Sequence, residues 1–252
     1  MVGDPVARQF ENMRISWPWV TARGPGARVI ERPGVTATIA PAVPARSMFN
    51  AVFYSDAARL EEALPDLAEV YEREGVEAFT VWIPEHDQRA LDLVQREGHV
   101  LDATPAAMEA GMDELSLPEP GDLDWTRDLT FPEANAVNNR AYPMTGEPFT
   151  SGGAPDSEGG HLYGARLDGE IASVVGILDV GEDAAVVSVA TLPEARGRGL
   201  AARLMGVALR EARERGARGT SLQATAAGEP VYLRLGYRIP FRFGMWERRG
   251  PK

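Results

Sequence analysis

The short segment Arg196-Gly197-Arg198-Gly199 has the residue types and the spacing of an anion-binding loop. Glycines allow the backbone to approach a ligand closely and to turn its amide groups inward. The two arginines add positive charge. A helical pattern begins at Leu200, and the first turn of a helix has unpaired N–H groups and the positive end of a dipole. The segment predicts a phosphate or pyrophosphate site, although glycine also occurs in strand-to-helix turns that bind nothing.

Three phosphate-binding patterns can be compared with this segment. A P-loop requires a Gly-Lys pair, and no lysine is present here. A dinucleotide-binding fingerprint fits the spacing of Gly197, Gly199 and Ala202, but it expects an acidic residue about 20 positions further on, at the end of the next strand. Residues 221–224 contain no carboxylate. The third pattern, Q/R-x-x-G-x-G/A, is matched by Arg196, Gly199 and Ala201.

The elements around the segment must present it to a ligand. We expect a strand over 184–191 before the loop and a helix over 200–215 after it, because Leu200, Leu204, Ala208 and Ala212 form one apolar stripe. Asp168-Gly169 predicts a type I′ hairpin turn. The other expected elements are strands 123–126, 162–167, 170–178, 220–224 and 241–246, and helices 132–141 and 229–235.

Over residues 123–252 the chain resembles the GNAT superfamily of acyl-CoA-dependent N-acetyltransferases. The loop resembles the family's pyrophosphate motif. The run Gly228-Glu229-Pro230-Val231-Tyr232-Leu233-Arg234-Leu235-Gly236-Tyr237 resembles its second motif, which usually ends Y-x-x-x-G-F. The sequence departs from the family where Thr225 replaces a common asparagine, Gly228 a common alanine and Tyr237 the final phenylalanine.

The resemblance implies an α+β fold with a mixed sheet that splays open to admit acetyl-CoA as co-substrate, without a metal. It also implies that a main-chain amide polarises the thioester carbonyl, and that Tyr232 protonates the departing thiolate; the alternative is that Tyr232 only packs on the sheet. The pyrophosphate would bind to the backbone amides of Arg196, Gly197, Arg198, Gly199, Leu200 and Ala201. The pantetheine arm would pair with Val189, Ala190 and Thr191.

The general base and the acceptor contacts are less clearly marked. Many members use a glutamate or a water chain, but the matching strand offers only Ser188, whereas Asp179, Glu182, Asp183 and His161 fit ordinary surface positions. Acceptor contacts are expected from helix 132–141, from the loop 143–160 and from the first domain. The candidates are Asn138, Asn139 and Tyr142, for which helix capping and packing are equally good explanations.

The first half of the chain echoes the second. Gly75 and Gly98 are separated by a strand and a helix, as are Gly216 and Gly236. We therefore predict a tandem GNAT-like fold, in which each half is a central, mostly antiparallel mixed sheet flanked by helices. The expected elements of the first half are an irregular segment 1–28, strands 28–40, 49–54 and 78–83, a helix over 56–74 divided at Pro65, and a helix over 87–97.

The Pro- and Gly-rich segment 117–122 predicts the domain boundary. Residues 1–118 would form a degenerate GNAT-like domain without a CoA loop, and residues 119–252 the catalytic N-acetyltransferase domain. In the first half Asp56 stands at the helix start, where a carboxylate caps the helix and repels phosphate. We expect this half to bind no CoA, to stabilise the fold and to shape the acceptor pocket.

Composition excludes several classes of function. The 252 residues include no cysteine and three histidines, which excludes disulfides, thiolate metal sites and a cysteine nucleophile, and disfavours a histidine metal site. A net charge of −11 makes nucleic acid and anionic membranes poor partners. The favoured binding partner is a small-molecule amine. The protein is expected to be a monomer or a homodimer. The N-terminus resembles no signal peptide, so a cytoplasmic location is expected.

The sequence therefore predicts an N-acetyltransferase that moves an acetyl group directly from acetyl-CoA to an amine. The acceptor could be a small amine, an aminoglycoside-like drug, a peptide N-terminus or a protein lysine. The alternative is a non-catalytic acyl-CoA sensor or regulatory module. A nicotinamide dinucleotide enzyme is disfavoured because the acidic residue of its fingerprint is missing.

Overall fold

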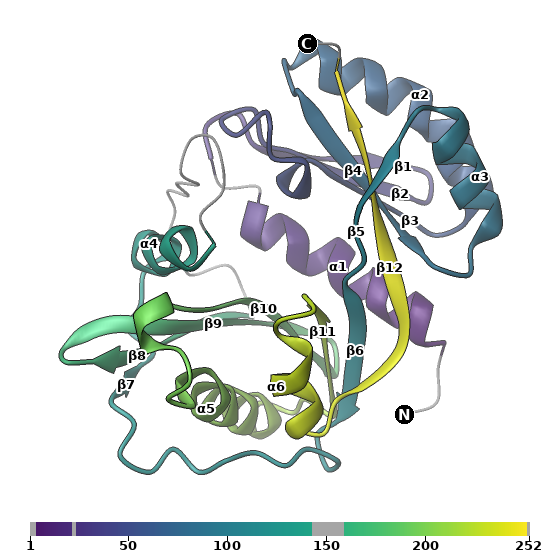
Figure 1. Cartoon of the computed structure of the whole chain (residues 1–252). Helices are drawn as coiled ribbons and strands as arrows, with labels where there is room; N and C mark the ends of the chain where they lie inside the picture. Colours follow the sequence, from purple (N-terminus) through teal and green to yellow (C-terminus); the bar gives the residue numbers. More distant parts are fainter. Residues whose placement is uncertain (1–3, 22–23, 143–158, 251–252) are drawn as a thin grey trace. The chain divides into compact units, whose positions relative to one another are not determined.

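A computed structural model describes residues 4–21, 24–142 and 159–250, which form two compact units (Figure 1). The N-terminal unit contains residues 2–107 and 240–252, and the C-terminal unit contains residues 108–239. Strands β6 (Ala106–Gly111) and β12 (Arg238–Arg249) each pass from one unit into the other. The division therefore does not coincide with the boundary expected at residues 118/119.

The proline-rich segment 117–122 lies within the C-terminal unit, where it is bound to a helix. Arg210 of helix α5 (Leu200–Glu214) donates to the carbonyls of Leu117 and Pro118, each at 2.9 Å. A Cβ on Gly206 of the same helix would lie only 2.5 Å from the Pro118 carbonyl oxygen. The segment is thus an ordered strap on α5, which explains why its linker-like composition does not mark the division.

The N-terminal unit contains strands in the order β1–β2–β3–β4–β12, and β5 also pairs with β12. The strand predicted over 28–40 is a hairpin, because Gly34 adopts a φ of +72° between its arms. Strands β3 and β4 are parallel, whereas β12 is antiparallel to β4. The bounds are β1 (Arg28–Arg32), β2 (Val35–Ile39), β3 (Ala51–Tyr54), β4 (Ala78–Pro84) and β5 (Val100–Ala103), with a 3-10 turn η1 (Ser47–Phe49).

Helix α1 (Pro5–Thr21) covers one face of this sheet, and the expectation of an irregular N-terminal segment is wrong. The side chain of Asp4 accepts the Val6 N–H at 2.9 Å and so caps the helix. Phe10, Met13 and Trp17, at helical spacing, pack on the apolar cluster of the sheet. This burial outweighs the hydrogen bond that Pro18 removes near the helix end.

Helices α2 (Ala57–Arg73) and α3 (Gln88–Arg96) pack on the opposite face. The expected division of α2 at Pro65 is wrong, because the helix is continuous through it. Leu60, Leu64 and Leu67, each at most 1% exposed, form the buried stripe that holds both halves of the helix on the sheet. Gly75 ends α2 with a φ of +69°, as predicted.

The C-terminal unit contains strands in the order β6–β11–β10–β9–β8–β7. Asp168 and Gly169, with φ of +53° and +85°, confirm the predicted hairpin turn between β8 and β9. Strands β7, β8, β9 and β10 pair antiparallel with their neighbours, whereas β10 and β11 are parallel. Their bounds are β7 (Trp125–Thr126), β8 (Gly160–Leu167), β9 (Glu170–Val180), β10 (Asp183–Thr191) and β11 (Gly219–Ala224).

Helix α4 (Phe131–Ala141) lies on one face of this sheet, whereas α5 and α6 (Glu229–Arg234) lie on the other (Figure 1). A capping box begins α4, in which the Thr130 side chain accepts the Glu133 N–H and the Glu133 side chain accepts the Thr130 N–H. The 3-10 turn η2 (Pro193–Ala195) connects β10 to residues 196–199, Arg-Gly-Arg-Gly, which we call the glycine segment. Each unit thus has parallel and antiparallel strand pairs with flanking helices, which confirms the predicted fold class.

Candidate functional site

The register between β10 and β11 ends after the first three residues of β10. The parallel register runs from Asp183↔Gly219 to Ala185↔Ser221, and β10 continues for six residues to Thr191. On its other edge, the register with β9 shifts between Val187 and Ala190, and Ser188 in this bulge has a φ of +53°. Such bulges redirect a strand. The end of β10 therefore has one edge on β9 and one edge without β11 beside it.

Both glycines of the glycine segment, which follows η2, have free space where a side chain would begin. Gly197 and Gly199 have φ of +76° and +73°, and a Cβ added to either would meet nothing within 4 Å. Gly199 is the N-cap of α5, and no side chain caps this helix. The first amides of α5 are thus left for solvent or a ligand, and the helix dipole favours an anion there.

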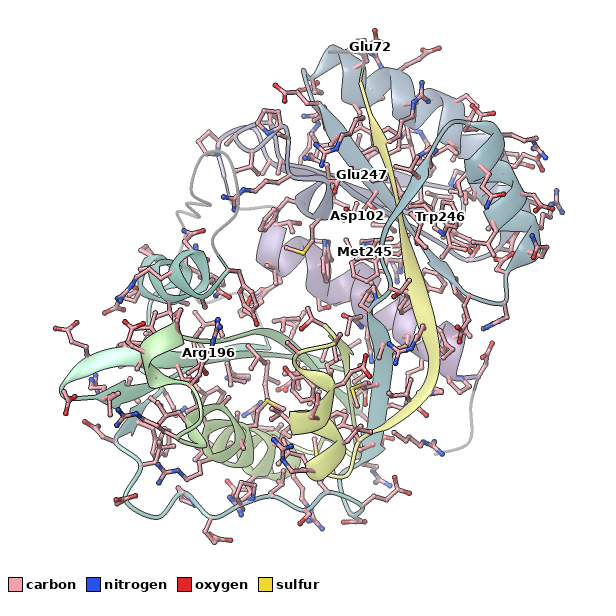
Figure 2. The ribbon with its side chains drawn as sticks, in the orientation of Figure 1. Glu72, Asp102, Arg196, Met245, Trp246 and Glu247 are labelled. Atoms are coloured by element: carbon pink, nitrogen blue, oxygen red, sulfur yellow. The ribbon has the colours of Figure 1, made fainter. Side chains whose placement is uncertain are left out.

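The two arginines of the segment differ in their surroundings. The Arg196 guanidinium donates from Nη2 to the Ala141 carbonyl at 2.8 Å and from Nε to the Thr191 carbonyl at 3.3 Å; its position is labelled in Figure 2. Arg198 is exposed and makes no hydrogen bond or ion pair with any described residue. Arg196 therefore ties α4 to β10, whereas Arg198 can direct its charge to a ligand.

Tyr232 on α6 is buried, with 8% of its surface exposed. Its ring meets that of Tyr237 edge-on, with centroids 5.9 Å apart. A Cβ on Gly228 would lie 3.1 Å from the Tyr232 ring, which gives a steric reason for glycine at a position where the resemblance expects alanine. Burial raises the pKa of Tyr232, and the nearby Tyr142 raises it further, so the phenol is protonated at neutral pH. A protonated phenol fits the role of a proton donor.

The predicted acceptor contacts lie near the C-terminal end of α4. Asn138 donates to the Ala134 carbonyl of its own helix at 3.0 Å, and Asn139 is half-buried. Tyr142 is 48% exposed and donates from Oη to the Val189 carbonyl at 3.0 Å. Tyr142 is thus the one of these three for which a contact with β10 is described. Most of the expected acceptor loop, 143–158, lies outside the described residues.

The acidic candidates lie at the other end of β10 from the bulge. Arg215 donates to both oxygens of Asp179, at 2.7 and 2.9 Å, and His161 contacts the same carboxylate at 3.3 Å. Burial raises the pKa of Asp179, but the bonds to Arg215 outweigh it and hold the pKa below its ordinary value. Glu182 forms an ion pair with Arg218 at 3.2 Å. The structure does not bring these groups to the Ser188 bulge.

Residues 127–237 match the family model for the acetyltransferase (GNAT) family. The C-terminal unit therefore contains a GNAT-family domain, and we call this unit the GNAT domain. A comparison with curated proteins finds no match.

Solved structures with the same fold extend over the whole chain. A GCN5-related N-acetyltransferase from Kribbella flavida is 19% identical, with a TM-score of 0.69, 97% of this chain covered and 96% of that one. A GNAT-family protein from Novosphingobium aromaticivorans is 21% identical, with a TM-score of 0.61 and coverages of 99% and 100%. A tandem GNAT protein from the clavulanic acid biosynthesis pathway is 13% identical, with a TM-score of 0.63 and coverages of 95% and 88%. At these identities the likeness establishes the fold, which is that of GNAT proteins, tandem ones included.

In the N-terminal unit, side chains of the protein itself bond at the counterparts of the open β10 edge and of the uncapped start of α5. Its parallel strands β3 and β4 pair only at Ala51↔Thr80 and Val52↔Val81. Beyond them the Tyr54 hydroxyl donates to Asp87 at 2.7 Å and joins the end of β3 to the start of α3. The Asp56 side chain accepts the first amides of α2, those of Ala58 and Arg59, at 3.0 and 3.1 Å. Here the protein's own carboxylate occupies the place that an anion would take.

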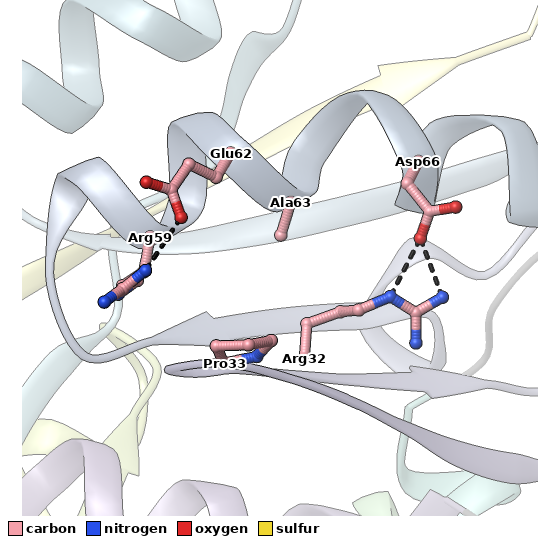
Figure 3. A pocket seen from close by; sticks show the side chains of 6 residues that line it. All are labelled: Arg32, Pro33, Arg59, Glu62, Ala63 and Asp66. Carbon is pink, nitrogen blue, oxygen red and sulfur yellow. Dashed lines mark hydrogen bonds and ion pairs between the residues drawn. The ribbon is translucent and has the colours of Figure 1, made fainter.

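A hollow of about 290 Å³ lies between α2 and the β1–β2 turn of the N-terminal unit (Figure 3). Its charged side chains pair with each other: Arg32 with Asp66 at 2.7 Å, and Arg59 with Glu62 at 2.9 Å. Because each guanidinium already has a carboxylate, this hollow offers no unpaired charge to a phosphate-bearing ligand.

Two further findings concern metals and membranes. Within residues 4–21, 24–142 and 159–250, no three His, Cys, Asp or Glu side chains are grouped as a metal ion would require. In the same part of the chain, no helix is both long and apolar enough to cross a membrane.

Proposed function

We propose that the GNAT domain binds acetyl-CoA and transfers its acetyl group directly to a small-molecule amine. The observation that carries this proposal is the continuity of an open strand edge with an uncapped helix start. Residues 186–191 of β10 run beyond the register with β11, and the glycine segment leads from them into α5. A thioester on an extended arm and a pyrophosphate can bind to such a surface together.

Different residues of the GNAT domain bind the pyrophosphate, bind the pantetheine arm and donate a proton to the thiolate. The amides from Arg196 to Ala201 bind the pyrophosphate, with the open glycines allowing close approach, and Arg198 adds a full charge. Val189, Ala190 and Thr191 pair with the pantetheine arm, and an amide of this edge donates a hydrogen bond to the thioester carbonyl. Tyr232, whose phenol is protonated at neutral pH, donates its proton to the departing thiolate.

The acceptor is an amine that binds beside the end of α4, where Asn138, Asn139 and Tyr142 lie. The net charge of −11 favours a cationic acceptor. Asp179 and Glu182 are paired with Arg215 and Arg218, so neither serves as the base in this proposal, and the amine arrives neutral or loses its proton through water. Because the chain contains no cysteine, the acetyl group passes without a thioester to the enzyme.

The N-terminal unit has a supporting role in this proposal. The carboxylate of Asp56 and the Tyr54–Asp87 hydrogen bond oppose phosphate and thioester binding there, so one acetyl-CoA binds per chain. We further propose that the protein acts in the cytoplasm, as a monomer or a homodimer. Gel filtration with light scattering tests the oligomeric state.

Thermal unfolding with added ligands tests the proposal. Acetyl-CoA should raise the unfolding temperature by mass action, whereas NAD should not. A panel of amines is then incubated with acetyl-CoA, and the release of the free CoA thiol is followed with a thiol reagent. Stabilisation by NAD alone would refute the proposal. Stabilisation by acetyl-CoA without thiol release for any amine would support the non-catalytic acyl-CoA sensor.

A further inference from the structure

The open edge of β10 presents two carbonyl groups that already have donors. Ala190 directs its carbonyl to Ser173 of β9, with 3.1 Å between the Ser173 Oγ and the Ala190 oxygen. Carbonyls of successive residues in a strand point to opposite edges. The carbonyls of Val189 and Thr191 therefore point away from β9, toward the side from which β11 has separated.

Both of these carbonyls accept hydrogen bonds from side chains of the GNAT domain. The Tyr142 hydroxyl donates to Val189 at 3.0 Å, and Arg196 Nε donates to Thr191 at 3.3 Å. Arg196 also donates to the Ala141 carbonyl at 2.8 Å, and the neighbouring Arg140 pairs with Glu194 of η2. We call Tyr142 and Arg196 the edge cap.

The two members of the edge cap are held differently. Arg196 is fixed at both ends, because its guanidinium bridges the carbonyls of Ala141 and Thr191. Tyr142 follows the last residue of α4 and is 48% exposed, and within the described part of the chain its hydroxyl makes one hydrogen bond, to Val189. Tyr142 can therefore rotate into solvent at the cost of one hydrogen bond, whereas Arg196 would lose two.

An extended arm that pairs with a strand edge uses that edge's carbonyls for its own N–H groups. We propose that the Tyr142 hydroxyl competes with the pantetheine arm of the acyl donor for the Val189 carbonyl and leaves it when the donor binds. Tyr142 thus limits the affinity for the donor arm, while Arg196 stays in place. This inference rests on the proposed function of the GNAT domain.

Calorimetric titration of wild type and Tyr142→Phe with two probes tests the inference. Coenzyme A carries the pantetheine arm, whereas adenosine 3′,5′-bisphosphate has the adenosine, the 3′-phosphate and one 5′-phosphate, without the second phosphate and the arm. Tyr142→Phe should bind coenzyme A about fivefold more tightly, since one neutral hydrogen bond no longer has to be broken. Its affinity for adenosine 3′,5′-bisphosphate should not change. Tyr163→Phe, which removes a hydroxyl bonded to Glu211 instead, should change neither affinity.

The outcomes separate the two proposals. If Tyr142→Phe binds coenzyme A with unchanged or weaker affinity, while the wild type binds it, the competition is refuted and the proposed function stands. An equal gain for both probes also refutes the competition, because the effect would then not involve the arm. If the wild type binds neither probe, the proposed function fails and the inference fails with it.

Discussion

Substitution of Gly199 by alanine separates the folding role of the glycine segment from its binding role. Gly199 begins α5 with a φ of +73°, and Gly75 ends α2 with a φ of +69°. A Cβ added to either residue meets nothing within 4 Å. Gly75→Ala is therefore a matched control, because the same left-handed backbone carries the same methyl group in open space.

The cost in stability should be equal for the two variants. A left-handed conformation costs an L-residue about 1–2 kcal/mol relative to glycine. In a chain of this size each kcal/mol lowers the unfolding temperature by about 2–4 °C. Differential scanning calorimetry of both variants measures this shift, and two similar shifts would show that neither methyl group causes a clash.

Gly199→Ala should lower the affinity for coenzyme A, whereas Gly75→Ala should not. Its methyl group projects from the start of α5, where we place the pyrophosphate, and would keep the phosphate oxygens from the amides. One hydrogen bond to a charged group is worth about 1.5–3 kcal/mol, so coenzyme A should bind roughly 10- to 100-fold more weakly. Calorimetric titration measures this affinity. Equal affinities for Gly199→Ala and Gly75→Ala would refute the assignment of the glycine segment.

Three further predictions test the proposed acid and two sources of stability. Tyr232→Phe should lower the rate of thiol release at least about 100-fold without changing the affinity for coenzyme A, and unchanged turnover at every pH would exclude an acid role. Burial lowers the pKa of His99 to about 4, so the folded protein binds fewer protons than the unfolded one below about pH 6.5. Urea unfolding should therefore show a free energy that falls by about 3 kcal/mol from pH 6.5 to 4, and His99→Phe should remove this fall; its persistence would contradict the assignment. Arg215→Gln leaves the half-buried Asp179 without its arginine and should lower the free energy of unfolding by about 2 kcal/mol, whereas Arg218→Gln, from an exposed ion pair, should change it by less than about 0.5 kcal/mol. Equal losses in urea unfolding would show that burial does not distinguish the two ion pairs.

Contiguous patterns predicted the parts of the GNAT domain that local chemistry determines. The Asp168-Gly169 turn and the helix that starts after Gly199 follow from the residues at those positions, and the structure confirms both. The assigned roles of Tyr232 and of the glycine amides stay predictions. The direction of the Arg196 side chain could not be foreseen, because its partner Ala141 is 55 residues away in the sequence.

Prolines account for the two wrong helix predictions. Pro18 lies in the segment 1–28 that the sequence predicts as irregular, and Pro65 is where it predicts a division of α2, because a proline removes one backbone hydrogen bond from a helix. In the structure the apolar faces of α1 and α2 are buried on the sheet on both sides of each proline. Strands β5 and β6 were not predicted, and short exposed segments such as β5 carry little periodic signal.

The passage of β12 between the two units has a consequence for the order of events during synthesis. Residues 240–249 supply the strand that pairs with β4, and Phe241, Phe243 and Met245 belong to the apolar cluster beneath α1. A ribosome delivers these residues after residues 108–239 of the C-terminal unit. The N-terminal unit therefore cannot complete its sheet when it emerges, and it must wait for the whole GNAT domain to be translated, although domains usually fold in the order in which they emerge.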